Sequence, residues 1–246
     1  MTEPLFLAHL DSPGVGDHVQ LSGEEGRHAA SVRRIKPGEV VWLSDGAGTA
    51  VRGPVVSVGR SELVVEVAEV VHAPEKPIRW VVVQALPKGD RAEQAVEMLT
   101  ELGVDEIVPW QAERSVVRWA PERVERGLTR WRATAREAAK QSRRLRVPVV
   151  SAPMTTAELA LRIGQSALTA VLHEVAEDPI AEVTVPAAGE VILVVGPEGG
   201  LTDAEVATFA AAGGRVVLIA DQVLRTSTAG VVGLAQLQVL AARDAR

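Results

Sequence analysis

The spacing of hydrophobic residues changes character near residue 75. Before this point, short runs rich in Val and Leu are separated by Gly, Asp, Ser and Pro, which is typical of β-strands. The expected strands are 4–10, 18–22, 39–46, 49–58 and 62–71. A helix is expected over 24–34, because Pro37 and Gly38 cannot continue it. The pattern predicts a small β-barrel domain over 1–73, followed by a linker at 72–77 that holds two prolines.

After the linker, runs with strand character alternate with runs of helical periodicity. The expected strands are 78–86, 105–110, 166–174, 189–196 and 215–220, and the expected helices are 90–104, 121–142, 155–164, 202–213 and 227–246. Alternating strands and helices predict βαβ units and a mostly parallel sheet. We therefore expect one α/β domain over 74–246. Ligands of such sheets bind beyond the carboxyl ends of the strands.

The composition of the chain restricts the class of protein that it can be. The chain has 246 residues, of which 47% are hydrophobic and 24% are charged, and its net charge is −6, as in soluble globular proteins. The apolar runs are too short to cross a bilayer, and the N-terminus does not look like a signal peptide. The chain has no cysteine, and its five histidines lack ligand spacing. We expect a cytoplasmic protein with no membrane partner and no metal.

The charges are distributed unevenly. Between 112 and 150 the chain has eleven Lys or Arg against four Glu. A basic segment in an acidic chain can bind a polyanion such as RNA. The alternative is a solvated helix face whose arginines pair with glutamates at helical spacing, and composition alone favours this alternative.

A glycine-rich stretch, GPEGG at Gly196–Gly200, lies between a predicted strand and a predicted helix. Glycines cost conformational entropy, so three of them indicate a need for bare backbone. Thr202 and Glu205 form a capping-box pattern at the helix start. No Lys-Ser/Thr follows, and the stretch is not G-x-G-x-x-G, so it is no phosphate-binding fingerprint. An ordinary strand-to-helix turn is the alternative, although one glycine would suffice for it.

Two more loops carry polar side chains at the same predicted edge. Thr226, Ser227 and Thr228 crowd the start of the last helix, where hydroxyls ordinarily act as caps. Arg225 precedes them and opposes the helix dipole, which favours a role toward an anion or a substrate. His173 lies at the end of a third expected strand, and a lone histidine at a strand end is more often structural than catalytic.

Four motifs in order give a family resemblance over nearly the whole chain. LVVGPEGGLTDAE (193–205) and VLRTSTAG (223–230) resemble the C-terminal signature of SPOUT-class RNA methyltransferases, and most closely that of the 16S ribosomal RNA uridine N3-methyltransferases. HAASVRRIKPGEVVWLSDG, KGDRAEQAVEMLTELGVDEIVPWQAERSV and AAKQSRRLRVP (28–46, 88–116 and 138–148) resemble further motifs of this family. Met98, Ile219-Ala220 and Ser227 depart from its pattern, so no catalytic role is carried over to them.

The resemblance implies a C-terminal SPOUT domain with a trefoil knot and a mostly parallel sheet, over 74–246, behind a PUA-like RNA-binding barrel. It implies a homodimer whose site takes residues from both subunits, and S-adenosylmethionine as cofactor. The implied cofactor-binding residues are Leu172, His173, Gly196, Pro197, Glu198, Gly199, Gly200, Leu218, Ile219, Ala220, Val223, Leu224, Thr226, Ser227, Thr228 and Ala229. The glycines would let backbone approach the cofactor.

The resemblance also changes the interpretation of the basic segment, which now is expected to face ribosomal RNA. The expected RNA-binding residues are His28, Arg34, Lys36, Lys88, Arg91, Arg114, Gln141, Arg143, Arg144 and Arg146. The expected catalytic residues are Arg225, which would stabilise charge on the uridine carbonyls, and Glu198. Glu198 is a candidate general base, and a role as a cap or as an acceptor for ribose is the alternative.

Together, these expectations predict that the protein methylates N3 of a specific uridine in 16S ribosomal RNA, in the assembled small subunit. The nearest alternative is a SPOUT methyltransferase acting on a ribose 2′-hydroxyl or another base of ribosomal or transfer RNA. A catalytically inactive RNA-binding protein is an alternative of another class. An ordinary doubly wound nucleotide enzyme is disfavoured by the missing phosphate fingerprint.

Overall fold

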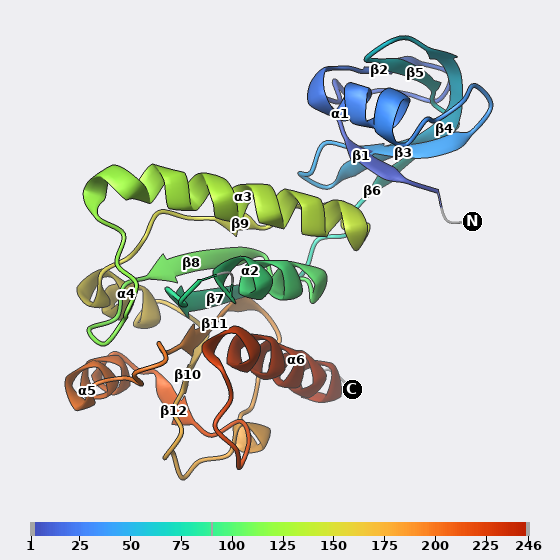
Figure 1. Ribbon diagram of the computed structural model, residues 1–246. Helices are drawn as coiled ribbons and strands as arrows, with labels where there is room; N and C mark the ends of the chain where they lie inside the picture. The colour runs from blue at the N-terminus through green and yellow to red at the C-terminus, as the bar shows by residue number, and fades with distance from the viewer. Residues whose placement is uncertain (1–2, 90, 245–246) are drawn as a thin grey trace. The chain divides into compact units, whose positions relative to one another are not determined.

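The computed structural model describes residues 3–89 and 91–244. The chain divides into two compact units (Figure 1). The first consists of 1–75 together with 139–147, and the second consists of 76–138 together with 148–246. A short part of the basic segment, 139–147, therefore belongs with the N-terminal unit. Nothing in the hydrophobic pattern predicted this return of the chain.

The first unit is built on six strands. They are β1 (Leu5–Leu7), β2 (His18–Leu21), β3 (Val40–Ser44), β4 (Thr49–Val58), β5 (Leu63–Glu66) and β6 (Glu69–His72). The strand order is β1-β3-β4-β5-β2, and β6 pairs with β4. Only β1 and β3 run parallel among these pairs. The core is apolar, with Leu43, Val51 and Leu63 fully buried.

Two predicted elements of this unit were wrong in detail. The single strand expected over 62–71 is two strands, because β5 pairs with the second half of β4 and β6 with the first half. The chain crosses β4 at Gly53, where a Cβ would meet the carbonyl oxygen of Glu66. The helix expected over 24–34 is a short helix α1 (Gly23–Arg27) that continues as a π-helical turn, η1 (His28–Val32).

The returning segment 139–147 is hydrogen-bonded to the turn between β3 and β4. The Val147 amide donates to the Gly46 carbonyl at 2.9 Å, and Ser44 Oγ donates to the Leu145 carbonyl at 3.3 Å. The Arg146 guanidinium donates to the Ala47 carbonyl. Lys140 forms an ion pair of 2.8 Å with Glu25. Backbone bonds and an ion pair therefore fix the segment to this unit.

The second unit contains a parallel sheet of six strands, as the alternating pattern predicted. They are β7 (Ile78–Ala85), β8 (Glu106–Trp110), β9 (Val149–Val150), β10 (Leu168–Leu172), β11 (Gly189–Val195) and β12 (Arg215–Val217), in the order β12-β10-β11-β7-β8-β9. Every pairing in it is parallel. The helices are α2 (Arg91–Glu101), α3 (Val124–Gln141), α4 (Thr156–Ile163), α5 (Asp203–Ala211) and α6 (Thr226–Asp244), with 3₁₀ turns η2 (Pro121–Arg123) and η3 (Ile180–Glu182).

The helices cover the sheet in layers (Figure 1). α2 packs on α6, which lies on β7 and β11, whereas α4 and α5 pack together. Alternate residues of β7 serve the two faces. Val81 and Val83 belong to the core that contains Leu159 of α4 and Phe209 of α5, and Gln84 lies beneath α6. None of the helices in the described ranges is long and apolar enough to span a membrane.

The strand expected over 215–220 ends at Val217. Beyond it, the Leu218 amide donates to the Asp178 carbonyl, and the Ile180 amide donates to the Leu218 carbonyl, both at 2.8 Å. The chain thus leaves the sheet for the η3 loop. Two short elements, β9 and η3, were not predicted, because two or three residues carry no periodicity. The predicted helix over 90–104 is α2, and Asp90 lies outside the described residues.

Candidate functional site

The carboxyl ends of β10, β11 and β12 meet the start of α6 at one pocket. It is lined by residues from three loops: Leu172, His173, Glu174, Val195, Gly196, Pro197, Gly200, Leu201, Leu218, Ile219, Ala220, Asp221, Gln222, Val223, Leu224, Thr226 and Ala229. These loops lie at the edge of the sheet where ligands of parallel α/β proteins bind. The three loops predicted from sequence are therefore neighbours in space.

Most of the predicted cofactor residues line this pocket: Leu172, His173, Gly196, Pro197, Gly200, Leu218, Ile219, Ala220, Val223, Leu224, Thr226 and Ala229. Four predicted residues do not line it, namely Glu198, Gly199, Ser227 and Thr228. Ser227 is buried in the first turn of α6, and Thr228 faces solvent. Five lining residues were outside the predicted set, which are Glu174, Val195, Leu201, Asp221 and Gln222. Each of them adjoins this set or another of the five in sequence, so a wider window around each loop would have included them.

The glycine loop has reasons for its glycines inside the chain. A Cβ on Gly199 would come within 3.0 Å of the Arg114 Cβ and 3.1 Å of its carbonyl oxygen. Gly200 has φ of +72°, a conformation that side chains disfavour. At Gly196 a Cβ would crowd Leu201 at 3.1 Å. Packing and backbone geometry thus require bare backbone at Gly199 and Gly200, whatever the loop binds.

The segment 113–114 is hydrogen-bonded to the glycine loop and to the start of α5. Arg114 Nη1 donates to the carbonyls of Gly199 at 3.4 Å and Leu201 at 3.3 Å. The capping box predicted at α5 is confirmed, with Thr202 and Glu205 bonded reciprocally. Glu205 Oε1 also accepts from the Glu113 amide at 2.8 Å. Arg114, predicted to bind RNA, therefore contacts the glycine loop in this structure.

Glu198 connects the glycine loop to the loop between β7 and α2. Its Oε1 accepts a hydrogen bond from the Lys88 amide at 3.0 Å, and its side chain is otherwise exposed. Because this donor is a backbone group, it fixes one carboxylate oxygen without neutralising its charge. Glu198 thus sits at the edge of the pocket, in a defined position.

The start of α6 is anchored by a buried polar residue that sequence reasoning missed. Gln84 is fully buried at the end of β7, and its Nε2 lies 3.5 Å from the Thr226 carbonyl oxygen. A Cβ on Gly230 would approach the Gln84 Oε1 at 3.3 Å. An amide inside an otherwise apolar strand, WVVVQA, was the signal available in the sequence.

Arg225 lies immediately before α6, and its side chain is exposed. Its carbonyl accepts from the amides of Thr228 and Ala229, both at 2.8 Å, so its backbone belongs to the first turn of the helix. Within the described part of the chain, its guanidinium forms no ion pair. The side chain is therefore available to an anion at the end of the sheet that carries the pocket.

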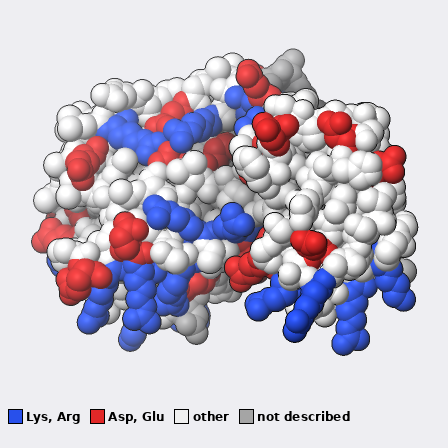
Figure 2. All heavy atoms as spheres, turned by 90° about the horizontal axis from the view of Figure 1, so that it is seen from above, with Lys and Arg blue, Asp and Glu red and all other residues white. Residues whose placement is uncertain are grey.

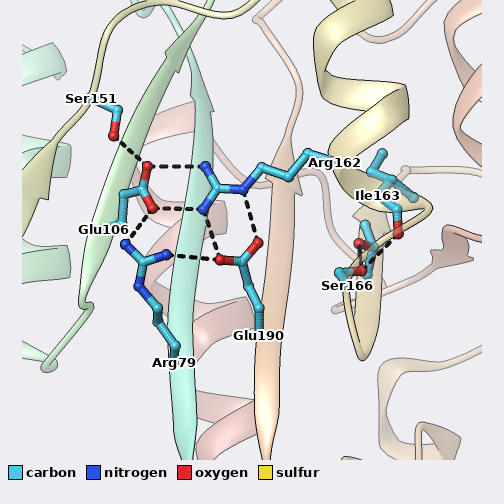
Figure 3. Close-up of polar contacts among 8 residues, drawn as sticks. Arg79, Glu106, Ser151, Arg162, Ile163, Ser166 and Glu190 are labelled. Atoms are coloured by element: carbon cyan, nitrogen blue, oxygen red, sulfur yellow. Dashed lines mark hydrogen bonds and ion pairs between the residues drawn. The ribbon is translucent and has the colours of Figure 1, made fainter.

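The opposite, amino-terminal edge of the sheet is closed by ion pairs (Figure 3). Arg162 of α4 contacts Glu106 of β8 at 2.6 Å and Glu190 of β11 at 2.8 Å. Arg79 of β7 contacts the same two carboxylates at 2.8 and 2.9 Å. Ser151 also donates to Glu106. The two arginines and two glutamates satisfy one another, which indicates a structural role.

The contacts in this cluster shift the pKa values of Glu106, Glu190 and Arg162. Burial raises the pKa of Glu106, but the hydrogen bonds from Arg162 and Ser151 and the charges of both arginines outweigh it, so this pKa lies below its usual value. The hydrogen bonds from Arg162 likewise lower the pKa of Glu190. The two carboxylates in turn raise the pKa of Arg162. Glu106, Glu190 and Arg162 are therefore charged at neutral pH.

The predicted RNA-binding residues lie in both units. In the first unit, His28, Arg34, Lys36, Gln141 and Arg143 are exposed, whereas Arg144 and Arg146 are half-buried. In the second unit Lys88 and Arg114 are exposed and Arg91 is half-buried. On the face shown in Figure 2, Lys and Arg side chains gather in groups, with Asp and Glu among them.

The arginines of α3 and of the turn before it are only partly compensated by glutamates. Arg130 pairs with Glu93 at 2.7 Å, and Arg132 approaches Glu125 at 3.7 Å. Arg123, Arg126 and Arg136 are exposed and form no ion pair among the residues that the structure describes. Exposed pairs contribute little to stability. The uncompensated charge is thus what a polyanion-binding surface needs.

No group of three or more His, Asp or Glu in 3–89 and 91–244 is arranged to hold a metal ion.

Comparison with known proteins agrees with these features. Residues 74–238 match the RNA methyltransferase domain family, and residues 21–68 match the RNA methyltransferase PUA domain family. The chain is 43% identical over 243 residues to the ribosomal RNA small subunit methyltransferase E of Mycobacterium tuberculosis, covering 97% of this chain and 93% of that protein. It is 30% identical to the protein of this name from Bacillus subtilis, covering 88% of each.

Solved structures of similar proteins have the same fold. A ribosomal RNA small subunit methyltransferase E from Neisseria gonorrhoeae, bound to S-adenosyl methionine, aligns with a TM-score of 0.87 at 27% identity, covering 97% of this chain and 98% of that one. A methyltransferase from Legionella pneumophila with bound SAM aligns with a TM-score of 0.84 at 26% identity, with the same coverage. With its PUA domain and its methyltransferase domain, the chain belongs to the ribosomal RNA small subunit methyltransferase E family.

Proposed function

We propose that this protein uses S-adenosylmethionine to methylate N3 of a specific uridine in 16S ribosomal RNA, within the assembled small subunit. The observation that carries the proposal is the pocket at the carboxyl edge of the sheet. Two of the three loops that build it, 196–200 and 218–229, lie in or overlap the stretches whose sequences resemble the uridine N3-methyltransferases, and the third, 172–174, is the one that this resemblance implies beside them. Two similar structures hold the cofactor named here.

The lining of the pocket fits this cofactor. Leu172, Leu201 and Leu224 offer apolar contacts for an adenine ring, and backbone groups of the glycine loop are accessible without side-chain bulk. The carboxylates of Glu174 and Asp221 suit the hydroxyls of ribose or an ammonium group. The cofactor would supply a methyl group that is already electrophilic on its sulfonium, so the chain needs no covalent nucleophile.

The pocket holds about 90 Å³, less than the ~300–1,000 Å³ of sites that enclose a whole drug-sized ligand. Asp221, Gln222 and Val223, on one wall, are exposed. We propose that this part of the 218–229 loop moves outward and then closes on the cofactor. Such closure would also exclude water from the reacting atoms.

The proposed substrate determines what the side chains must do. N3 of uridine carries a proton and lies on the Watson–Crick edge, so the base must be unpaired before it can react. Loss of the proton spreads negative charge over O2 and O4, and the Arg225 guanidinium would stabilise it. Glu198, whose carboxylate is positioned by the Lys88 amide, is the proposed general base.

RNA would be held by both units. In the first unit, His28, Arg34 and Lys36 lie in the PUA-matching part, and Gln141, Arg143, Arg144 and Arg146 in the returning segment. In the second unit, Lys88, Arg91 and Arg114 lie near the carboxyl edge. Lys and Arg contacts to phosphate release counterions, so RNA affinity should fall steeply with salt. A flat salt dependence would contradict this part of the proposal.

We further propose that the protein is a cytoplasmic homodimer, that its second domain begins near residue 74, and that its chain forms the trefoil knot of the family. An apolar hollow of about 470 Å³ beside α6 supports the dimer. Val239 in this hollow is 69% exposed, and the Gln236 Oε1 is buried with no hydrogen-bond partner among the residues that the structure describes. The hollow shares Leu218–Asp221 with the cofactor pocket. A second copy covering it would therefore reach the site.

The direct test is methyl transfer from labelled S-adenosylmethionine to small ribosomal subunits that lack the modification, and to the same RNA without protein. The RNA is then digested to nucleosides. Label in 3-methyluridine, and more of it with subunits than with naked RNA, is expected. Label in a 2′-O-methyl nucleoside or in another base would overturn the assignment of N3. No label and no cofactor binding would leave an RNA-binding protein.

A further inference from the structure

A second hollow opens at the carboxyl end of the sheet, one strand away from the cofactor pocket. It lies at the end of β7 and is lined by the β7–α2 loop, the first turn of α2, the segment before α3, and α3 itself: Leu86, Pro87, Gly89, Ala92, Glu93, Val117, Trp119, Gly127, Arg130 and Trp131. Its volume is about 230 Å³, below the ~300–1,000 Å³ typical of sites for drug-sized ligands. It suits a single ring system.

The hollow is built around Trp119, which is half-exposed. Trp119 packs edge-to-face on the buried Trp131, with ring centroids 5.4 Å apart. A Cβ on Gly127 would lie 2.6 Å from the Trp119 ring, so glycine is required where the ring meets α3. Glycine inside a helix is unfavourable relative to alanine. Gly127 thus leaves the space in which the Trp119 indole packs against α3.

One basic residue lines the hollow, and two more adjoin its lining residues. Arg130 lines the hollow, and its charge is shared with Glu93 at 2.7 Å. Arg126 is four residues before Arg130 in α3, on the same side of the helix, and is exposed without an ion pair in the described part of the chain. Lys88 adjoins the lining residues Pro87 and Gly89, and its side chain is exposed. The phosphate groups next to a bound base would therefore lie near these basic side chains.

Hydrogen bonds join the segments that line this hollow to the glycine loop of the cofactor pocket. The Lys88 amide, in the loop that lines the hollow, donates to Glu198 of the glycine loop at 3.0 Å. On the other side, Arg114 precedes the Trp119 segment and donates to the carbonyls of Gly199 and Leu201. A ligand in the hollow would therefore contact the same loops that hold the glycine loop.

We propose that this hollow binds an unpaired nucleobase of the RNA substrate, stacked on Trp119, with its phosphate near Lys88 and Arg126. Aromatic side chains beside basic residues bind single-stranded RNA in this way, because every base offers a π-face. The base is separate from the uridine that reacts, since that one must reach the cofactor pocket. The inference rests on the proposed function only in taking RNA as the substrate.

The test measures binding, so its result does not depend on methyl transfer. A short single-stranded oligouridylate is titrated into the full-length protein and into Trp119→Leu, Trp119→Phe and Trp42→Phe variants. Trp42 is the control, because it is a half-buried tryptophan of the first unit whose indole already bonds Glu3. Affinity is followed by anisotropy of labelled RNA, and stacking by quenching of tryptophan fluorescence.

Trp119→Leu should weaken RNA binding about 5- to 150-fold, since stacking on an aromatic side chain is of this size. Trp119→Phe should keep the affinity within about threefold, because it keeps a π-face. Quenching should disappear in both variants and persist in Trp42→Phe. The affinity for S-adenosylmethionine should not change in any variant, which separates this site from the cofactor pocket.

Three results would overturn the proposal. Trp119→Leu could bind RNA as tightly as the parent while its unfolding midpoint falls, which would make Trp119 a packing residue only. RNA could fail to quench the parent protein. Uridine monophosphate could bind and quench as strongly as the oligonucleotide, which would identify a site for free nucleotides. If quenching behaves as expected but no methyl is transferred, the stacking site stands and the proposed reaction fails.

Discussion

The two edges of the parallel sheet are built in opposite ways. At the amino-terminal edge, Arg79, Glu106, Arg162 and Glu190 from four elements satisfy one another. At the carboxyl edge, a glycine loop and the exposed carboxylates of Glu174 and Asp221 line a pocket, and the exposed Arg225 lies in sequence between the lining residues Leu224 and Thr226. Charges that are already paired stabilise a fold, and charges left without partners are available to a ligand. One edge therefore holds the sheet together, and the other is the proposed site of reaction.

The largest effect is expected at Arg225. Arg225→Lys should lower turnover by about 10²- to 10³-fold, as does the loss of a group that stabilises developing negative charge. Affinity for S-adenosylmethionine, measured by calorimetry, should change little. Arg243→Lys, in the last turn of α6, is the matched control and should keep full activity. Near-normal turnover of Arg225→Lys would remove Arg225 from the mechanism.

Two substitutions at Glu198 distinguish a chemical role of its carboxylate from a structural one. Glu198→Gln keeps an oxygen that can accept from the Lys88 amide but cannot take a proton, so turnover should fall about 10²-fold. Glu198→Ala should lose at least as much, and it also frees the glycine loop. Both are measured as single-turnover rates at saturating cofactor. If Glu198→Gln kept its activity while Glu198→Ala lost it, the carboxylate would hold the loop and nothing more.

Substitutions at the amino-terminal edge should change the stability of the protein and not its turnover. Arg162→Met removes the partner of two carboxylates, one of them buried, and should lower the free energy of unfolding by about 3 kcal/mol. Arg79→Met, whose side chain is half-exposed, should cost about 1 kcal/mol. Denaturant titration measures both. Turnover per folded molecule should be unchanged, and a loss of turnover in Arg162→Met would mean that the two edges are coupled.

The same cluster gives a pH dependence of defined sign. The pKa values of Glu106 and Glu190 are lowered in the folded chain, so the unfolded chain binds protons first as pH falls. Their contribution to stability is present above about pH 4.5, the usual value, and decreases as pH falls through the lowered folded values. Arg162→Met should show a shallower loss below pH 4.5. Parallel curves for the two proteins would refute this origin of the slope.

The smallest expected effect concerns the loop beside the pocket. Trypsin should cut after Arg225, since residues 221–223 and 225 are exposed. If this loop closes on the cofactor, S-adenosylmethionine should slow the cut several-fold, and fragment masses identify the bond. Cleavage after exposed Arg60 in the first unit is an internal control that should not change. Equal slowing at both positions would indicate general stabilisation.

The sequence predicted the parallel sheet and its ligand edge because both follow from local patterns. Strand and helix periods give βαβ units, and the loops at 172–174, 196–200 and 218–229 then fall at one edge. The capping box of α5 was predictable because Thr202 and Glu205 are three residues apart. The family resemblance, not the residues alone, gave the cofactor and the reaction.

What could not be predicted depends on contacts between distant segments. Strand β12 stops at Val217 because Leu218 pairs with the η3 loop about forty residues earlier. The return of 139–147 to the first unit rests on bonds to the β3–β4 turn, such as that from Val147 to Gly46. The reason for Gly199 is Arg114, which is far away in sequence. No short window contains such pairs.

The most direct test of the difference between the two edges is amide hydrogen exchange with and without S-adenosylmethionine. The cofactor should protect 172–174, 195–201 and 218–229, and leave the strand starts at Arg79, Glu106 and Glu190 unchanged. Protection confined to those starts, or none in the three loops at saturating cofactor, would contradict a cofactor site at the carboxyl edge.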